Sequence, residues 1–178
     1  VRVTEHSVVT IKNKSHSVTA QLTAPDGGAE GVIITQGGRV GGWALYAKGG
    51  KLKYCYNFFG IEYYFTTADK PIPAGEHQVR MEFKYDGGGL AKGGDVTLYY
   101  DGKPVGKGRV EQTQPMGYSA DEACDVGSDT ESRASPDYGP TGNRFTGEIE
   151  WVQLDIGEDS HDHLIRPEDR FNLAMARQ

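Results

Sequence analysis

The carboxylates of one polar stretch are the first residues in this sequence that could do chemistry. Asp121, Asp125 and Asp129 follow one another at intervals of four residues. Carboxylate oxygens are the ligands that Ca²⁺ prefers, in sets of six to eight. The stretch lacks the 1-3-5 spacing and the closing glutamate of an EF-hand loop, so the competing interpretation is that the aspartates accept hydrogen bonds from turn N–H groups. We treat the three residues as candidate calcium ligands and expect no other cofactor.

Two further groups of titratable residues could do catalysis or bind a metal. Glu148 and Glu150 share one face of an expected strand, and paired carboxylates can hydrolyse glycosides. Glycosidases of the laminarinase type carry a third acid in a Glu-x-Asp-x-x-Glu arrangement, which this sequence lacks, so a solvated strand face explains the pair better. His161, Asp162 and His163 lie in a polar segment, which favours solvated side chains over metal ligands. We therefore predict no catalytic residue.

Aromatic residues offer a different chemistry, because their rings can stack on sugar rings. The candidates for such a platform are Trp43, Tyr54, Tyr56, Phe59, Tyr63 and Tyr64. Strand alternation places Tyr54 and Tyr56 on the same face as Leu52 and Phe58, which is the expected core face. Core packing is thus the first interpretation of these aromatics, and a carbohydrate platform is the second.

The composition and charge of the chain narrow the classes of partner that it can bind. The chain has 178 residues, a formal net charge of −6 and a pI near 5.4, which argues against a general nucleic-acid binder. No apolar run approaches the length of a transmembrane helix and no signal segment is evident, so no membrane partner is expected, and a cytoplasmic or periplasmic location stays open. Two cysteines, Cys55 and Cys124, form either one bridge or two buried thiols.

Alternating apolar and polar residues predict the elements that position these groups. The clearest pattern covers residues 78–85, with Arg80 expected to face water, and the pattern recurs over 95–100 before the hairpin signal Asp101-Gly102. Further strands are expected over 7–11, 17–23, 31–36, 43–47, 51–58, 61–66, 103–111 and 144–156. In the last of these the phase slips at Trp151 and Val152, which indicates a β-bulge. Such short strands with glycine-rich turns between them predict an all-β antiparallel sandwich or barrel.

Two segments depart from this pattern. Residues 112–143 are polar and rich in glycine, proline and aspartate, and a loop of this length in a compact domain is usually functional or disordered. Residues 167–177 predict a short C-terminal helix, with Pro167 at its first position. The expected organisation is therefore a β-sandwich domain over residues 1–157, followed by a linker and a helix over residues 158–178.

Several motifs in order resemble the C-terminal region of a group of bacterial arylsulfatases. They include Gly41-Gly42-Trp43-Ala44-Leu45-Tyr46, Tyr85-Asp86-Gly87-Gly88-Gly89, Ser135-Pro136-Asp137-Tyr138-Gly139-Pro140, Asn143-Arg144-Phe145-Thr146-Gly147 and the ending from His161. The resemblance implies a concanavalin A-like jelly roll that follows an alkaline-phosphatase-like catalytic domain in the parent enzyme. That catalytic domain would be the partner, and it is absent here.

The resemblance carries over no catalytic residue. Sulfatases need a Cys/Ser-x-Pro-x-Arg motif for formylglycine, and neither Cys55 nor Cys124 begins one. We therefore expect a non-catalytic accessory domain that packs against the sulfatase domain and helps to shape its substrate entrance. A carbohydrate-binding module is the alternative, and a free-standing hydrolase using Glu148 and Glu150 is the third hypothesis.

Overall fold

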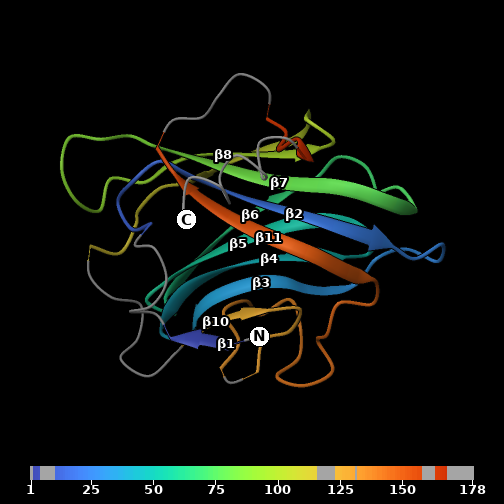
Figure 1. Ribbon diagram of the computed structural model, residues 1–178. Coiled ribbons are helices and arrows are strands. Elements are labelled where there is room, and N and C mark those ends of the chain that lie inside the picture. The colour runs from blue at the N-terminus through green and yellow to red at the C-terminus, as the bar shows by residue number, and fades with distance from the viewer. Residues whose placement is uncertain (1, 5–10, 116–122, 131, 158–162, 168–178) are drawn as a thin grey trace, which may run out of the picture.

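Two antiparallel sheets stacked face to face make up the protein (Figure 1). The structure, a computed structural model, describes residues 2–4, 11–115, 123–130, 132–157 and 163–167. Sheet A has the strand order β1 (Arg2–Thr4), β10 (Ala123–Val126), β3 (Gly31–Gly38), β4 (Gly41–Lys48), β5 (Lys51–Phe58) and β6 (Glu62–Thr67). Sheet B has the order β11 (Glu148–Ile156), β2 (His16–Ala24), β7 (Gly75–Tyr85), β8 (Gly94–Tyr100) and β9 (Lys103–Val110). The predicted antiparallel jelly-roll sandwich is confirmed.

The core between the sheets is built from the alternation that the sequence shows. Val79, Met81 and Phe83 of β7 point inward and are at most 4% exposed. Tyr54 and Tyr56 of β5 face them from sheet A and are also buried, so their assignment to the core is confirmed. Large aromatic side chains contribute most to such a core because each removes a large apolar area from water.

Local turn chemistry is also as expected. Asp101 and Gly102, between β8 and β9, both have positive φ angles, of 50° and 80°. Such a two-residue turn matches the twist of the flanking strands and sets their register. In β11 the pairing register with β2 shifts between Ile149 and Trp151, which confirms the predicted bulge.

The outer face of β7 differs from the prediction. Arg80 was expected to face water, but it is 3% exposed. Its guanidinium donates to Thr19 Oγ1 at 2.6 Å, to Ser17 Oγ at 3.1 Å and to Glu82 Oε1 at 3.0 Å. Burial of a charged group requires such partners, and alternation along one strand cannot show what neighbouring strands place beside it.

Other predictions fall partly or wholly outside the described residues. Only Ile11 of the expected strand 7–11 is described, and it is not in a strand; of the expected helix 167–177 only Pro167 is described. The segment 112–143, expected as a loop, contains the strand β10, which pairs with β1 and β3. No helix in the described part of the chain is long and apolar enough to cross a membrane.

Glycines in β9 bring the two sheets close together along one edge. A Cβ atom on Gly106 would lie 2.7 Å from the backbone oxygen of Thr67, and one on Gly108 would lie 2.1 Å from Thr66 Oγ1. Real Cβ atoms do not approach so closely, so only glycine lets β9 pack against β6 here.

Substitution of Gly106 tests this close approach. Gly106→Ala is expected to lower the free energy of unfolding by about 1–3 kcal/mol, because backbone must move to admit the methyl group. Urea denaturation measures the loss. Gly27→Ala is the matched control, since no atom lies within 4 Å of a Cβ there; equal effects of the two substitutions would contradict the packing argument.

Candidate functional site

The part of the long segment that runs over residues 132–143 packs on the outer face of sheet A; the sequence predicts a loop here that is either functional or disordered. Its Ala134 is fully buried against Val32, Ala44, Tyr46 and Cys55, which point away from the main core. Outward-facing side chains of a sandwich are usually solvated, so the segment supplies a second small core. Residues 132–143 are thereby held against the outer face of the sheet.

A buried hydroxyl and a lysine anchor this segment through Asp137. The Tyr46 hydroxyl donates to Asp137 Oδ2 at 2.6 Å, and the Lys53 ammonium forms an ion pair with the same oxygen. Lys48 Nζ donates to the backbone oxygen of Asp137 at 2.8 Å. Burial alone would raise the pKa of Asp137, but the hydrogen bonds from Lys53 and Tyr46 outweigh it and hold the pKa below its usual value. Asp137 therefore stays ionised and attracts both lysines.

The candidate calcium ligands that can be located already bind groups of the protein. Asp129 Oδ2 accepts the Ala134 N–H at 3.0 Å and the Tyr138 hydroxyl at 2.7 Å. Asp125 Oδ2 accepts from Thr130, from its N–H at 3.2 Å and from its hydroxyl at 2.5 Å. Asp121 lies outside the described residues.

No group of three or more His, Cys, Asp or Glu side chains suited to a metal occurs among the residues that the structure describes. Asp125 and Asp129 accept hydrogen bonds from nearby residues of the long segment. Calcium binding stays a prediction.

The remaining titratable candidates do not come together. Glu148 and Glu150 are exposed on β11, an edge strand of sheet B. His163 lies on the outer face of the same sheet, where its Nδ1 is 2.5 Å from Glu82 Oε1. His161 and Asp162 lie outside the described residues, so their predicted solvation is not tested.

Both cysteines are free thiols. Cys55 lies in the second small core under the long segment, and Cys124 is buried on β10. Burial raises the pKa of Cys55 to about 12 and that of Cys124 to about 11. Neither cysteine is therefore activated as a nucleophile, because the reactive form is the thiolate and burial disfavours it.

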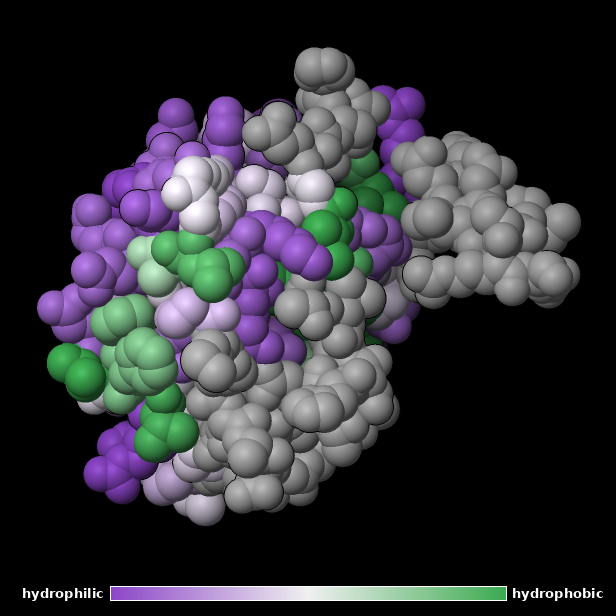
Figure 2. Space-filling view, turned by 90° about the vertical axis from the view of Figure 1, so that its left-hand side faces the viewer, coloured by the Kyte–Doolittle hydropathy of each residue, from purple (hydrophilic) through white to green (hydrophobic). Residues whose placement is uncertain are grey.

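Two turns and the long segment meet in a depression that we call the turn-end hollow. It has a volume of about 650 Å³, and its lining includes Arg39, Val40, Phe59, Tyr63, Ser132 and Arg133. Arg39 and Val40 form the turn between β3 and β4, and Phe59 lies in the turn between β5 and β6. This end of the sandwich faces the viewer in Figure 2, where green apolar groups stand among purple polar ones.

The backbone around the turn-end hollow is held in place. The Arg39 N–H donates to Ser132 Oγ at 2.9 Å, and Asn57 Nδ2 donates to the Arg39 carbonyl at 3.1 Å. A Cβ atom on Gly60 would lie 2.6 Å from that same carbonyl, so a glycine with φ +70° is required at this contact. The two turns and the segment are therefore joined by direct contacts.

Of the six aromatic candidates, two line the turn-end hollow. Phe59 is 43% exposed, and Tyr63 is half-buried, packed against the second small core. Trp43, Tyr54 and Tyr56 are buried in the main core, and Tyr64 packs against its edge. The sequence thus names both aromatic residues of the hollow among six candidates for which core packing is the first interpretation, and it does not point to Arg39 or Arg133.

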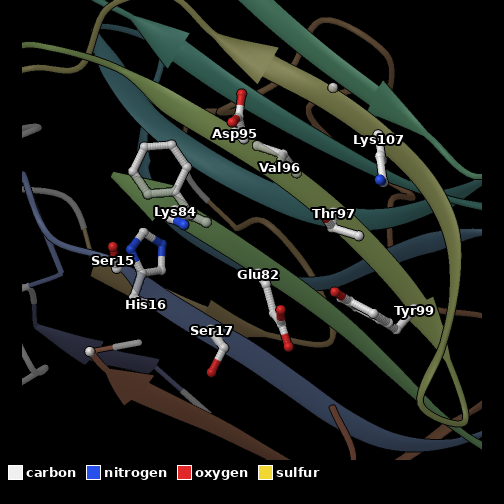
Figure 3. Close-up of a pocket in the computed structure, with 13 residues that line it drawn as sticks. Ser15, His16, Ser17, Glu82, Lys84, Asp95, Val96, Thr97, Tyr99 and Lys107 are labelled. Atoms are coloured by element: carbon white, nitrogen blue, oxygen red, sulfur yellow. The ribbon is translucent and has the colours of Figure 1, made fainter. Parts of the chain in front are cut away.

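A second depression crosses the outer face of sheet B. Side chains from β2, β7, β8 and β9 gather there (Figure 3), and we call it the sheet B groove. Its volume is about 570 Å³, and its polar lining includes Ser17, Glu82, Lys84, Asp95, Thr97 and Lys107. The lining thus carries two carboxylates and two ammonium groups.

The C-terminal segment covers one end of the sheet B groove. The His163 ring stacks on Tyr99 with centroids 4.5 Å apart. Ile165 is tied to Gln78 twice, since its N–H donates to Gln78 Oε1 at 2.8 Å and its carbonyl accepts from Gln78 Nε2 at 2.9 Å. The one aromatic ring on the outer side of the groove, Tyr99, is left 7% exposed, so little of it is open to a ligand.

Comparisons with known proteins identify the fold. A scan of protein families finds no match, and neither does a search of curated proteins. Among solved structures, the chain is similar to the CBM40 of the Ruminococcus gnavus IT-sialidase bound to α2,3 sialyllactose, at 14% identity and a TM-score of 0.54, over 84% of this chain and 80% of that one.

Two further solved structures support the same fold. The same CBM40 bound to α2,6 sialyllactose matches at 15% identity and a TM-score of 0.53, covering 84% and 81% of the two chains. A heptameric SAP-like pentraxin from Limulus polyphemus matches at 13% identity and a TM-score of 0.50, covering 84% and 68%. At these identities the likeness establishes the jelly-roll fold alone. No comparison supports the resemblance to arylsulfatases, so the accessory role beside a sulfatase domain stays a prediction.

A change of pH tests the burial of His16, which lies at the start of β2 beside the sheet B groove. Burial lowers its pKa from 6.5 to about 4, although the hydrogen bond from Nδ1 to the Lys14 carbonyl opposes the shift. The unfolded chain therefore binds a proton at His16 below pH 6.5 and the folded chain does not, so stability falls from pH 6.5 toward pH 4. The loss from this residue is about 3 kcal/mol at most. Urea denaturation across this range should show a shallower pH dependence for His16→Gln; equal slopes would contradict the assignment.

The role of Asp129 can be tested by removing its carboxylate. Asp129→Ala leaves the Ala134 N–H and the Tyr138 hydroxyl without this acceptor, so we expect a loss of about 1–3 kcal/mol in unfolding free energy. Asp26→Ala, at an exposed turn, is the control. If Asp129 serves only to anchor the loop, the wild-type melting temperature will be the same in calcium and in chelator. A calcium-dependent rise that Asp129→Ala abolishes would instead make Asp129 a metal ligand.

Proposed function

We propose that the protein is a carbohydrate-binding module and that the turn-end hollow is its binding site. The observation that carries the proposal is the pairing of an exposed aromatic ring, Phe59, and a half-buried one, Tyr63, with hydrogen-bonding side chains in one depression. Aromatic faces attract the C–H groups on the face of a sugar ring, while polar groups at the rim bind its hydroxyls.

The composition of the hollow supports this ligand class. Ligand sites combine a mainly apolar lining with a few well-placed polar groups, and here Val40, Phe59 and Pro136 supply the first while Ser132 and Arg133 supply the second. The hollow also lies at loops carried by a rigid sandwich, which is where binding residues concentrate.

The structural comparisons add support of a coarser kind. The CBM40 structures are of a domain bound to sialyllactose, so the same fold carries sugar recognition elsewhere. Fold does not imply function, and this likeness is an analogy of scaffold rather than of site. The argument for this chain therefore depends on the residues of the turn-end hollow.

The sheet B groove is less suitable for a sugar than the turn-end hollow. Its Tyr99 is stacked beneath His163 and is nearly buried. Its Glu82 is already bonded to Arg80 and lies against His163. A sugar entering there would find no accessible ring and would compete with these internal contacts.

Substitution of Phe59 tests the proposal. Phe59→Ala is expected to weaken binding of the best ligand from a glycan array at least tenfold, because a stacking face is lost. Isothermal titration calorimetry measures the change. Tyr63→Ala is a second variant, which also needs a melting curve because Tyr63 packs against the second small core.

Thr97→Ala, in the sheet B groove, is the control and should bind as the wild type does. A wild-type protein that binds no glycan would overturn the proposal. Binding that Thr97→Ala removes and Phe59→Ala leaves intact would overturn the choice of site.

A further inference from the structure

We infer that the turn-end hollow selects acidic glycans, by pairing a ligand carboxylate or sulfate with Arg39 and Arg133. This inference rests on the proposed function and names the substrate class of the same site. Carboxylate and sulfate share the chemistry that matters here, which is a pair of anionic oxygens on one atom that a guanidinium can contact through two N–H groups.

The charge of the hollow is opposite to that of the chain. The chain has 25 acidic and 19 basic residues. The hollow nevertheless has two guanidinium groups in its lining, and no carboxylate contributes to that lining among the residues that the structure describes. An acidic protein repels anions in general, so a local group of cations without a carboxylate is the place where an anion is most favoured.

One acidic side chain of the docked segment is already neutralised. Asp137, on the segment that forms one wall, is held by Lys53 and by Tyr46. Its charge is therefore balanced within the second small core and does not compete for the arginines. In the sheet B groove, by contrast, Glu82 and Asp95 offset Lys84 and Lys107, so that lining has no preference for an anion.

The two arginines are mounted on firm backbone and keep donors free for a ligand. Arg39 stands on the β3–β4 turn, whose backbone is bonded to Ser132 and Asn57. Arg133 is positioned by the donation of its Nη1–H to the Tyr138 carbonyl at 3.1 Å. A guanidinium has five N–H donors, so this bond leaves Arg133 able to grip an acidic group with the others.

The aromatic residues and the arginines then have separate tasks. Phe59 and Tyr63 offer faces to the sugar ring, and the guanidiniums select for the acidic substituent. A neutral sugar gains the stacking and the hydrogen bonds to its hydroxyls but no ion pair, so discrimination between acidic and neutral glycans comes from the charge of the arginines.

Calorimetric titration with three related sugars tests this inference. The probes are lactose, α2,3 sialyllactose and sulfated lactose, which differ in the presence of no acid, a carboxylate or a sulfate. We expect at least one acidic probe to bind at least ten times more tightly than lactose. The probe that does so shows whether a carboxylate or a sulfate is recognised. Hydrogen bonds to charged groups justify a factor of this size.

The variants locate the effect. Arg39→Gln, and Arg39→Gln combined with Arg133→Gln, should weaken binding of the acidic probe about tenfold or more, and by a larger factor than they weaken binding of lactose. Lys107→Gln makes the same charge change in the sheet B groove and should have no effect. Arg39 is exposed and its backbone contacts do not involve the guanidinium, so the single variant should fold normally.

The outcomes separate the two proposals. Acidic probes that bind no more tightly than lactose would overturn the inference and leave carbohydrate binding in place. Tighter binding of an acidic probe that both arginine variants retain would also overturn it. If no glycan on an array or in solution binds, the proposed function fails and the inference fails with it.

Discussion

The contact on which the site depends is the seating of Asp137 between Tyr46 and Lys53 on the outer face of sheet A. A partly buried carboxylate is stable only where donors and a cation replace its lost water. This requirement gives residues 132–143 one position on the sheet. Ala134 then fills the second small core, and Arg133 reaches the turns at the end of the sandwich. Without this anchor the turn-end hollow would lack one of its walls.

The sheet B groove and the turn-end hollow show that one fold can carry depressions that differ in how well they suit a ligand. The sheet B groove lies on a strand surface that the chain itself covers at one end with His163. The turn-end hollow lies where loops project beyond the sheets, and the aromatic ring of Phe59 in its lining is exposed. A rigid sandwich supports loops that can vary without loss of the core, which is why function on this architecture must be argued from the site and not from the fold.

Predictions from local patterns held where the physics is local. Strand alternation and the Asp101-Gly102 turn depend on neighbouring residues only, and both were confirmed, as was the bulge near Trp151. The prediction for Arg80 was wrong because Ser17 and Thr19, from a strand far away in sequence, bury its guanidinium. The short strand β10 was missed because its partners β1 and β3 lie far from it along the chain and its own residues are mostly polar or small.

The amino-acid sequence by itself determined the all-β architecture, the turns and the burial of Tyr54 and Tyr56 in the core. Alternating burial along a strand and positive φ angles in a turn are properties of short segments. Only the tertiary structure decided that Arg39, Phe59 and Arg133 share one hollow. They come from three segments of the chain, and no pattern within any one of them records the others. Their meeting follows from sheet pairing and from the docking of the long segment, which are long-range contacts whose geometry exists only once the two sheets have packed.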